Sequence, residues 1–368
     1  MKLLKALQYL VLFAGLAFVL TSCSNGKKKA KGLENEIFVV ADSSEYYYYE
    51  PVLQQIYGKV VYTPQPENLF HLQRKSINSL EEVKPYKNII IIAPLDSRSY
   101  TSRYINSLID SKVRAEIEKD SAFVFNKHDL WAKDQLVMIL TGPNKETLKM
   151  NMLKENENLL YYFTNVSDKR IGRNLFNPTY EKKDIEARTL FKYGWMMYAQ
   201  ADYQIAMEKP EDNFVWLRRE PNSYKERWVF VHWIENASPA FLDKDSIINR
   251  RNQLTKKYMH LMEGGGYVEF VDEYFKATEV NFNDKYAICT QGLWQFSDVS
   301  GGGPFINYTY YDEKTKRIYM LDAALLAPKY KKRGMLQQLD VLLHSFKSKY
   351  EVDPEKIEDL KDYYEEEK

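Results

Sequence analysis

Four consecutive isoleucines, Ile89–Ile92, restrict the fold of this chain more than any other feature of its sequence. A run that is apolar at every position suits a strand that is covered on both faces of its sheet. A second run of this kind, Leu136–Leu140, is followed by the turn formers Thr141-Gly142-Pro143. Helices are predicted over residues 99–119 and 145–161 from the spacing of their apolar side chains. The first half of the chain is therefore predicted to mix strands and helices.

The second half is predicted to be rich in strands. Four short runs look like a meander, a helix capped by Asp243 or Asp245 then extends to Met262, and four strands and a last helix follow. The predicted strands cover residues 195–198, 203–207, 214–218, 228–234, 267–275, 286–296, 305–311 and 317–326, and the last helix covers 332–346. The two halves together predict the α+β class, with mixed or antiparallel sheets packed with helices.

A chain of 368 residues is too long for one ordinary domain and about right for two of roughly 100–200 residues each. We expect an N-terminal subdomain over residues 35–165 and a strand-rich α+β subdomain over 186–350. The polar segment 166–185 between them is the predicted linker, or else a surface excursion of one continuous domain. The acidic tail, 351–368, is expected to be solvated and frayed at its end.

The N-terminus has the organisation of a secretory signal. Lys2 and Lys5 precede an apolar stretch, Ala6–Leu20, which is too short to span a bilayer comfortably. The stretch leads into Leu20-Thr21-Ser22-Cys23, which resembles the bacterial lipoprotein box Leu-x-(Ser/Ala/Gly)-Cys. In that family the cysteine thiol receives a diacylglycerol, cleavage follows, and the new N-terminus is acylated. The resemblance implies a signal peptide over 1–22 and a lipid on Cys23; a plain signal peptide with an accidental cysteine and an uncleaved anchor are the alternatives.

Several acyl chains on Cys23 would hold the protein stably on a membrane. A lysine-rich tether is expected over residues 23–34. Removal of Lys2 and Lys5 leaves 50 basic against 51 acidic side chains, so the mature chain is nearly neutral. With Cys23 acylated, Cys289 has no partner for a disulfide and is predicted to be a small buried hydrophobe rather than a nucleophile.

The composition and the motifs exclude several classes of protein. A formal net charge of +1 provides no field for a phosphate backbone, so we expect no nucleic-acid partner. Neither a phosphate-binding glycine loop nor a nucleophile elbow occurs in the sequence. No histidine or cysteine pair has the spacing of metal ligands, so no metal, cofactor or catalytic residue is predicted. A carboxylate pair that meets only in space remains open.

Three runs are candidates for binding a partner. The strongest combines Trp294 with Gly302, Gly303, Pro304 and Phe305, because glycines allow close backbone approach and a tryptophan offers a large contact face. A long hairpin loop is the alternative interpretation of this run.

The two other runs are weaker candidates. Gln65 and Glu67 lie between prolines that stiffen their loop, which is otherwise an ordinary rigid connector. The third run interleaves arginines with tryptophans and suits stacking on a base or sugar, or else forms a sheet core with arginines reaching the surface. Its residues are Trp216, Arg218, Arg219, Trp228 and Trp233.

These runs resemble a Bacteroidota family known as domain of unknown function 4837. Val61–Phe70 is similar to the family stretch L-P-Q-x-E-P-x-F, although Thr63 replaces the usual Leu and Pro66-Glu67-Asn68 alters the Glu-Pro order. The run Asn213–Glu220 resembles N-F-V-W-L-R. The family segment G-L-W … G-G-P-F … Y-D-E is matched by Gly292–Trp294, Gly302–Phe305 and Tyr311–Glu313. The resemblance covers nearly all of the mature chain and implies a lipoprotein, but no established activity.

Bacteroidota surface lipoproteins usually carry an acidic export signal after the cysteine, whereas the tether here is basic. We therefore expect a protein of the outer membrane that is anchored by lipid and faces the periplasm. Two function classes stay open: a non-enzymatic envelope lipoprotein that binds a protein or glycan partner, and an envelope hydrolase or transferase with an unrecognised carboxylate site. The missing nucleophile and metal motifs favour the first.

Overall fold

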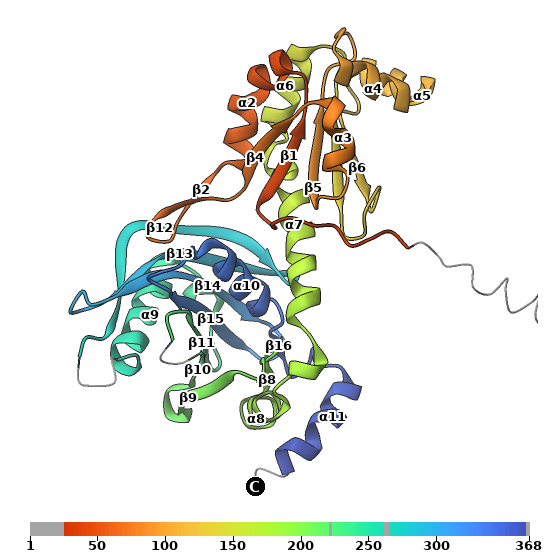
Figure 1. The fold of residues 1–368 in the computed structure, drawn as a ribbon. Coiled ribbons are helices and arrows are strands. Elements are labelled where there is room, and N and C mark those ends of the chain that lie inside the picture. The colour runs from red at the N-terminus through yellow and green to blue at the C-terminus, as the bar shows by residue number, and fades with distance from the viewer. Residues whose placement is uncertain (1–25, 221–222, 261–264, 366–368) are drawn as a thin grey trace, which may run out of the picture. The chain divides into compact units, whose positions relative to one another are not determined.

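The computed structural model describes residues 26–220, 223–260 and 265–365, so Cys23 lies outside the described residues. Helices and strands are both abundant, which confirms the predicted α+β class (Figure 1). The chain forms two compact units, one of Met1–Tyr49 and Gln73–Asn151, the other of Glu50–Leu72 and Met152–Lys368. Within the described residues, no helix combines the length and the apolar character needed to cross a membrane.

The first unit contains a five-stranded sheet in the order β4-β1-β5-β7-β6. The strands β1, β5 and β7 are parallel, while β6, which the sequence did not reveal, runs antiparallel at the edge. All four isoleucines Ile89–Ile92 are fully buried, as their pattern predicts. The strand bounds are β1 Glu36–Val40, β4 His71–Lys75, β5 Asn88–Ile92, β6 Val124–His128 and β7 Leu136–Leu140.

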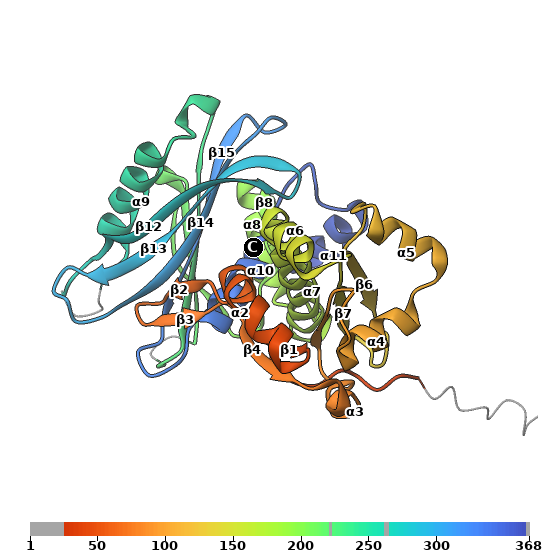
Figure 2. The same ribbon diagram turned by 90° about the horizontal axis from the view of Figure 1, so that it is seen from above.

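Helices cover both faces of this sheet. Figures 1 and 2 show α3 and α4 on one face and α2 and α6 on the other. The helix predicted over 99–119 is broken, because Ile109 is extended and the Asp110 side chain caps a new helix by accepting from the Val113 amide. The bounds are α2 Ser43–Tyr57, η1 Ile77–Ser79, α3 Leu80–Val83, α4 Tyr100–Leu108, α5 Ser111–Glu118 and α6 Lys145–Lys154.

Part of the segment expected to be a free tether is fixed on the first unit. The Ala30 amide donates to the Lys133 carbonyl at 2.8 Å, and the Lys31 amide donates to the Pro85 carbonyl at the same distance. The lysine-rich composition suggested a solvated segment, but these hydrogen bonds use the backbone and leave the lysine side chains at the surface.

The second unit contains a seven-stranded sheet in the order β12-β13-β14-β15-β11-β10-β9. All of its neighbouring strands are antiparallel, and β9, β10 and β11 form the predicted meander. The bounds are β9 Tyr203–Lys209, β10 Phe214–Arg219, β11 Glu226–Ile234, β12 Val268–Phe282, β13 Lys285–Phe296, β14 Gly302–Asp312 and β15 Arg317–Leu326.

Side chains alternate between two buried faces of this sheet. On one face, Trp216 and Trp228 pack in a cluster with the helix α9 (Lys244–Tyr258). On the other, Val215 and Val229 join a cluster with α10 (Arg333–Leu343). Of the two predicted caps of α9, it is the Asp243 side chain that accepts from the backbone amides at the helix start.

Three predicted features of the domain organisation differ from the structure. Most of segment 166–185 is helical, because α7 (Asn156–Leu175) extends through buried Ser167 and Arg170. The division between the compact units also lies elsewhere. The acidic tail forms a helix, α11 (Pro354–Glu365), in which Leu360 is buried and Tyr364 lies against Phe191.

Short elements complete the second unit. The strand predicted over 195–198 is only two residues long and pairs with a strand near the C-terminus instead of joining the meander. The remaining bounds are β2 Val60–Tyr62, β3 Pro66–Asn68, α7 Asn156–Leu175, η2 Pro178–Tyr180, α8 Lys183–Tyr193, β8 Trp195–Met196, η3 Pro210–Asp212, η4 Pro239–Phe241, β16 Lys347–Ser348 and α11 Pro354–Glu365.

The close approach of β14 and β15 explains the glycines at the start of β14. A Cβ atom on Gly303 would lie 1.9 Å from the carbonyl oxygen of Leu325, and a Cβ on Gly302 would lie 2.5 Å from that of Trp294. Neither neighbour is a flexible side chain. The backbone that approaches these glycines is thus that of the neighbouring strands of the same sheet.

We predict that Gly303→Ala destabilises the protein by about 1–3 kcal/mol, because the methyl group must push two strands apart. Gly301→Ala is the matched control, since the nearest atom to its added Cβ is an ordinary 3.5 Å away. Denaturant unfolding of both variants measures the difference. Equal stability of the two variants would contradict this account of the glycines.

Candidate functional site

The strongest predicted binding run is part of the sheet rather than an exposed loop. Trp294 of β13 lies opposite Gly303 of β14, and Leu293 lies opposite Pro304. Trp294 is 1% exposed and Phe305 is fully buried, so neither offers the contact face that we expected. The burial of Trp294 and Phe305 could not be predicted from the sequence, because consecutive glycines are typical of a turn. In the structure these glycines make room for the neighbouring strands instead.

A pocket of about 740 Å³ nevertheless lies beside this hairpin, and we call it the indole pocket. Aromatic walls are combined with a few polar groups, which is typical of ligand sites. Its lining residues are Trp216, Arg218, Ser223, Tyr224, Glu226, Trp228, His260, Gly265, Phe296, Ser300, Gly301, Gly302, Leu326 and Pro328.

Strand alternation places the two indoles of the pocket together. Arg218 of β10 lies opposite Trp228 of β11, so Trp216, two residues earlier, has its side chain on the same face. The rings of Trp216 and Trp228 meet edge to face at 5.8 Å between centroids. Phe296 of β13 completes this aromatic wall at 6.1 Å from Trp228.

The charged groups inside the pocket neutralise each other. Glu226 is the one carboxylate among its described lining residues, and its side chain is 4% exposed. The Arg218 guanidinium donates a hydrogen bond to it and lies 5.4 Å from the centre of the Trp216 ring. A paired, buried carboxylate is unsuited to act as a general base.

Two surface loops contribute Tyr224 and Pro328 to the lining of the pocket, and each loop places a lysine on the other's tyrosine. Lys329 Nζ lies 3.9 Å from the ring centre of Tyr224, and Lys225 Nζ lies 4.5 Å from that of Tyr330. Both tyrosines are exposed, by 59% and 43%. These four residues were missed by the sequence analysis because no local spacing joins the two loops.

The third predicted run is divided between the faces of the sheet. Trp216, Arg218 and Trp228 all line the pocket, whereas Trp233 lies in the core of the opposite face. Arg219 is held away from the pocket by an ion pair of 2.7 Å with Asp202. The three tryptophans are at most 6% exposed and belong to core clusters, so the alternative interpretation, a sheet core with arginines that reach toward the surface, describes this run better.

Gln65 and Glu67 are used inside the second unit. Glu67 Oε1 accepts from the Lys332 amide at 2.7 Å and from the Thr63 hydroxyl at 2.7 Å, so it satisfies backbone at the start of α10. Gln65 Oε1 accepts from Lys332 Nζ at 3.2 Å. Their loop has a structural role in this arrangement, as the rigid-connector interpretation expects.

Cys289 is likewise structural, because it is buried and its burial raises the thiol pKa to about 12.

A second pocket, of about 370 Å³, holds two acids and a histidine from α7 and α10. Burial raises the pKa of Asp168 to about 6 and that of Asp340 to about 6. Asp340 accepts from the Tyr308 hydroxyl at 2.7 Å, and His344 Nε2 lies 3.6 Å from the same carboxyl oxygen. The i,i+4 spacing of Asp340 and His344 was visible in the sequence, but Asp168 comes from another helix.

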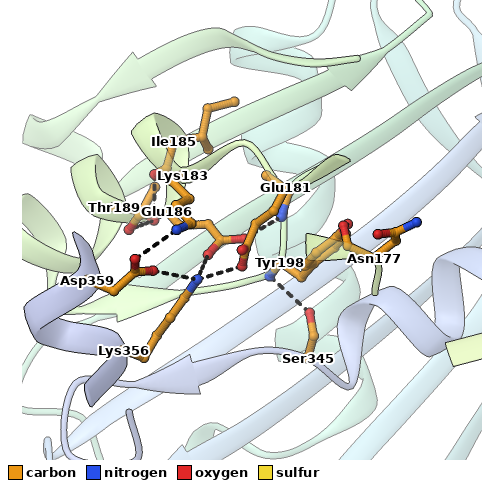
Figure 3. Close-up of polar contacts among 11 residues, drawn as sticks. Asn177, Glu181, Lys183, Ile185, Glu186, Thr189, Tyr198, Ser345, Lys356 and Asp359 are labelled. Atoms are coloured by element: carbon orange, nitrogen blue, oxygen red, sulfur yellow. Dashed lines mark hydrogen bonds and ion pairs between the residues drawn. The ribbon is translucent and has the colours of Figure 1, made fainter. Parts of the chain in front are cut away.

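A buried network joins α8 to α11, as Figure 3 shows. Glu186 is fully buried, accepts from the Ala199 amide at 3.0 Å and lies 3.1 Å from Lys356 Nζ. Lys356 also pairs with Glu181 at 2.5 Å, and Asp359 pairs with Lys183 at 2.7 Å. Burial raises the pKa of Glu186 to about 7, against the partial compensation of the Lys356 charge.

This pKa predicts a pH-dependent stability. Between pH 4.5 and 7 the native state keeps the proton of Glu186 while the unfolded state releases it, so rising pH costs the wild type stability. Glu186→Gln cannot release a proton. The melting temperature of the wild type should therefore fall relative to that of Glu186→Gln from pH 5 to pH 8. Glu358→Gln, on the exposed side of α11, is the control, and a pH-independent difference for Glu186→Gln would contradict the prediction.

Two family models match the chain, and both describe domains of unknown function. Residues 181–345 match the domain of unknown function (DUF4837), which includes the runs at Asn213–Glu220 and Gly292–Glu313. Residues 30–176 match a different family, the domain of unknown function (DUF8532). The match to DUF4837 therefore covers less of the chain than we expected. Val61–Phe70, which we compared with that family, falls within the match to DUF8532 instead. No curated protein matches the chain.

Two solved structures show weak similarity. The Saccharomyces cerevisiae Ran-binding protein Mog1p aligns with a TM-score of 0.29 at 11% identity, over 44% of this chain and 93% of that one. The human StarD13 (DLC2) lipid transfer and protein localization domain aligns with a TM-score of 0.21 at 10% identity, over 41% and 89%. Because both TM-scores are below 0.5, these similarities support no conclusion about this chain.

Proposed function

Residues 181–345 belong to the family described as domain of unknown function 4837, and from that premise we propose that this protein is a lipid-anchored, non-enzymatic binding protein of the bacterial cell envelope. Its ligand site in this proposal is the indole pocket. The observation that carries the proposal is the combination of two tryptophans, a phenylalanine and a few polar groups around a space of about 740 Å³.

The chemistry of the pocket favours a glycan over a purely apolar ligand. Trp216, Trp228 and Phe296 line the pocket with apolar atoms, although each is at most 6% exposed, so only a small part of their surface is open to the carbon face of a sugar ring. Ser223, Ser300 and the other polar lining groups suit hydroxyl groups on such a ligand. Since the lining carboxylate Glu226 is already paired with Arg218, we expect the ligand to be bound and released without chemical change.

The anchoring part of the proposal rests on the N-terminal sequence. The charged start, the apolar stretch Ala6–Leu20 and the small residues before Cys23 match what lipoprotein processing requires. The basic residues that follow favour the periplasmic face of the outer membrane.

A second candidate function is an envelope hydrolase or transferase. The observation in its favour is the smaller pocket, where the pKa values of two carboxyls, Asp168 and Asp340, are raised toward the range of a general acid. The mainly apolar lining around these acids gives a substrate few polar partners, so we place this candidate second.

Filling the indole pocket tests the binding proposal. Ser300 lies in the turn at its edge and is exposed, so Ser300→Trp should occupy the pocket without disturbing the core, whereas Ser300→Ala loses the same hydroxyl and leaves the space open. On an oligosaccharide array, the full-length protein in detergent and the Ala variant should bind the same glycans and the Trp variant should bind none.

The array also separates the two functions. Glycans recovered unchanged after incubation support a binding protein, while cleaved or transferred products that disappear with Asp340→Asn would favour the enzyme. Equal binding by the Trp and Ala variants would remove the indole pocket from the proposal.

The anchor is tested at Cys23. We predict that Cys23→Ala yields a chain that is washed from membranes, or that is retained only as an uncleaved precursor, because the acceptor of the lipid is gone. Fractionation after a salt wash and intact mass measurement distinguish these results. A fully processed Cys23→Ala protein that still sediments with membranes would refute the lipid anchor.

A further inference from the structure

The N-terminal part of the described chain gathers lysines at one edge of the first unit. Lys29 is joined to Lys133, and Lys31 to Tyr86, by parallel backbone bridges. The buried Gln135 side chain donates to the Tyr86 carbonyl at 2.7 Å and holds the two loops together. Because β5 and β7 begin directly after these loops, the surface lies at the edge where the parallel strands start. We call it the lysine face, and it is formed by segments 27–31, 84–87 and 127–134.

The lysine face is strongly basic in a chain that is nearly neutral. Its three segments contain eight lysines and two aspartates, a net charge of +6 with His128 neutral, whereas the whole chain has +1. Glu34 pairs with Lys87 at 2.7 Å and Glu81 pairs with Lys84, so acids outside the segments offset two of these charges. An excess of positive charge is left, which creates a field that attracts anions. The two aspartates are Asp129 and Asp134.

The lysine face combines this charge with exposed apolar side chains. Lys28, Lys127 and Lys133 are exposed, and the Lys133 amide donates to the Lys28 carbonyl at 2.9 Å, so the backbone that carries them is already ordered. Leu130 lies in one of the segments and is 37% exposed, and Leu33, just after another, is 66% exposed. Lysines beside exposed leucines suit the interface of a bilayer, which offers both anionic headgroups and apolar acyl chains.

The length of chain before the lysine face places it close to the expected lipid. Cys23 lies only three residues before Gly26, where the described residues begin. An extended chain spans at most about 3.6 Å per residue, so Cys23 is within roughly 11 Å of Gly26. This distance is close to the range over which exposed charges interact at physiological ionic strength, about 8 Å. A lipid on Cys23 would therefore hold the lysine face near the headgroups.

We propose that the lysine face docks on the surface of a membrane that carries anionic lipid headgroups. This inference rests on the proposed lipid anchor, to which it adds a protein surface and a class of lipid. The anchor brings the face to the bilayer, and the lysines then contact the phosphates of the headgroups. Docking also orients the first unit, with the starts of its parallel strands toward the membrane and their carboxyl ends away from it.

The reactivity of lysines on vesicles tests the docking. The processed protein is inserted into preformed vesicles of phosphatidylcholine, with or without phosphatidylglycerol, and labelled with a water-soluble acetylating reagent that mass spectrometry detects. We expect labelling of Lys28, Lys127 and Lys133 to fall at least about fivefold in the anionic vesicles, since each lysine near such a surface contributes roughly that factor to binding. High salt should restore it. Lys119 and Lys145 should be labelled equally in both vesicles.

A charge-deleted variant tests whether the lysines cause the docking. Lys28→Gln with Lys127→Gln and Lys133→Gln removes three charges and keeps the backbone hydrogen bonds of these residues. Lys31, which is exposed on the same face, provides the measurement in this variant. Its labelling should be lower in the anionic vesicles for the wild type, and equal in both kinds of vesicle for the variant.

The matched control is Lys112→Gln with Lys119→Gln and Lys145→Gln, which removes three exposed lysines on or next to α5 and α6. Since β6 runs antiparallel to β7, the segment before β6 and the helix after β7 lie at the opposite edge of the sheet. This control should keep the protection of Lys31 in anionic vesicles.

The outcomes separate this inference from the proposed anchor. Equal labelling of the lysine face in both kinds of vesicle, with the protein still held in them, overturns the docking and leaves the anchor. Protection that persists in the charge-deleted variant, or that is equally strong at Lys119 and Lys145, overturns the docking as well. If intact mass shows that the protein from cells carries no acyl groups, the anchor and the docking both fall.

Discussion

The burial of both faces of the seven-stranded sheet is the constraint on which the second unit depends. Each strand must present one set of side chains to α9 and the alternate set to α10, as Trp216 and Val215 do. A slip of one residue would exchange the two sets and place the tryptophans against the wrong helix. Arg251 and Asp322 add polar specificity to this packing, since their fully buried ion pair of 2.7 Å joins α9 to β15 at one position.

The indole pocket follows from where the cover of α9 ends. Trp216, Trp228 and Phe296 belong to the same buried cluster as the helix, and His260, two residues beyond its last turn, lines the pocket. The helix therefore shields most of this aromatic face and leaves its margin to surface loops.

Local sequence patterns predicted a strand correctly where the strand's own residues show which of its faces are buried. The isoleucines of β5 and the apolar side chains of β10 and β11 indicate buried strands by themselves. These strands could therefore be identified without knowing which strands pair with them. The polar segment after residue 165 misled the prediction, because α7 buries Ser167, Arg170 and Gly172 against other parts of the second unit. Composition alone cannot show that a polar helix has neighbours.

The candidate site could be predicted only in part. Trp216, Arg218 and Trp228 carry a recognisable aromatic and basic pattern, and antiparallel pairing of two adjacent strands brings them together. The contacts of Lys329 with Tyr224 and of Lys225 with Tyr330 depend on two loops about a hundred residues apart, which no spacing rule connects. The need for glycine at position 303 could not be predicted either, since it comes from the close approach of the Leu325 carbonyl on another strand.

The charged clusters inside the second unit are paired internally. Arg251 with Asp322, and Lys356 with Glu181 and Glu186, are closed arrangements in which each charge has an opposite charge within 3.1 Å. Such pairs fix helices in place and have little left to offer a ligand.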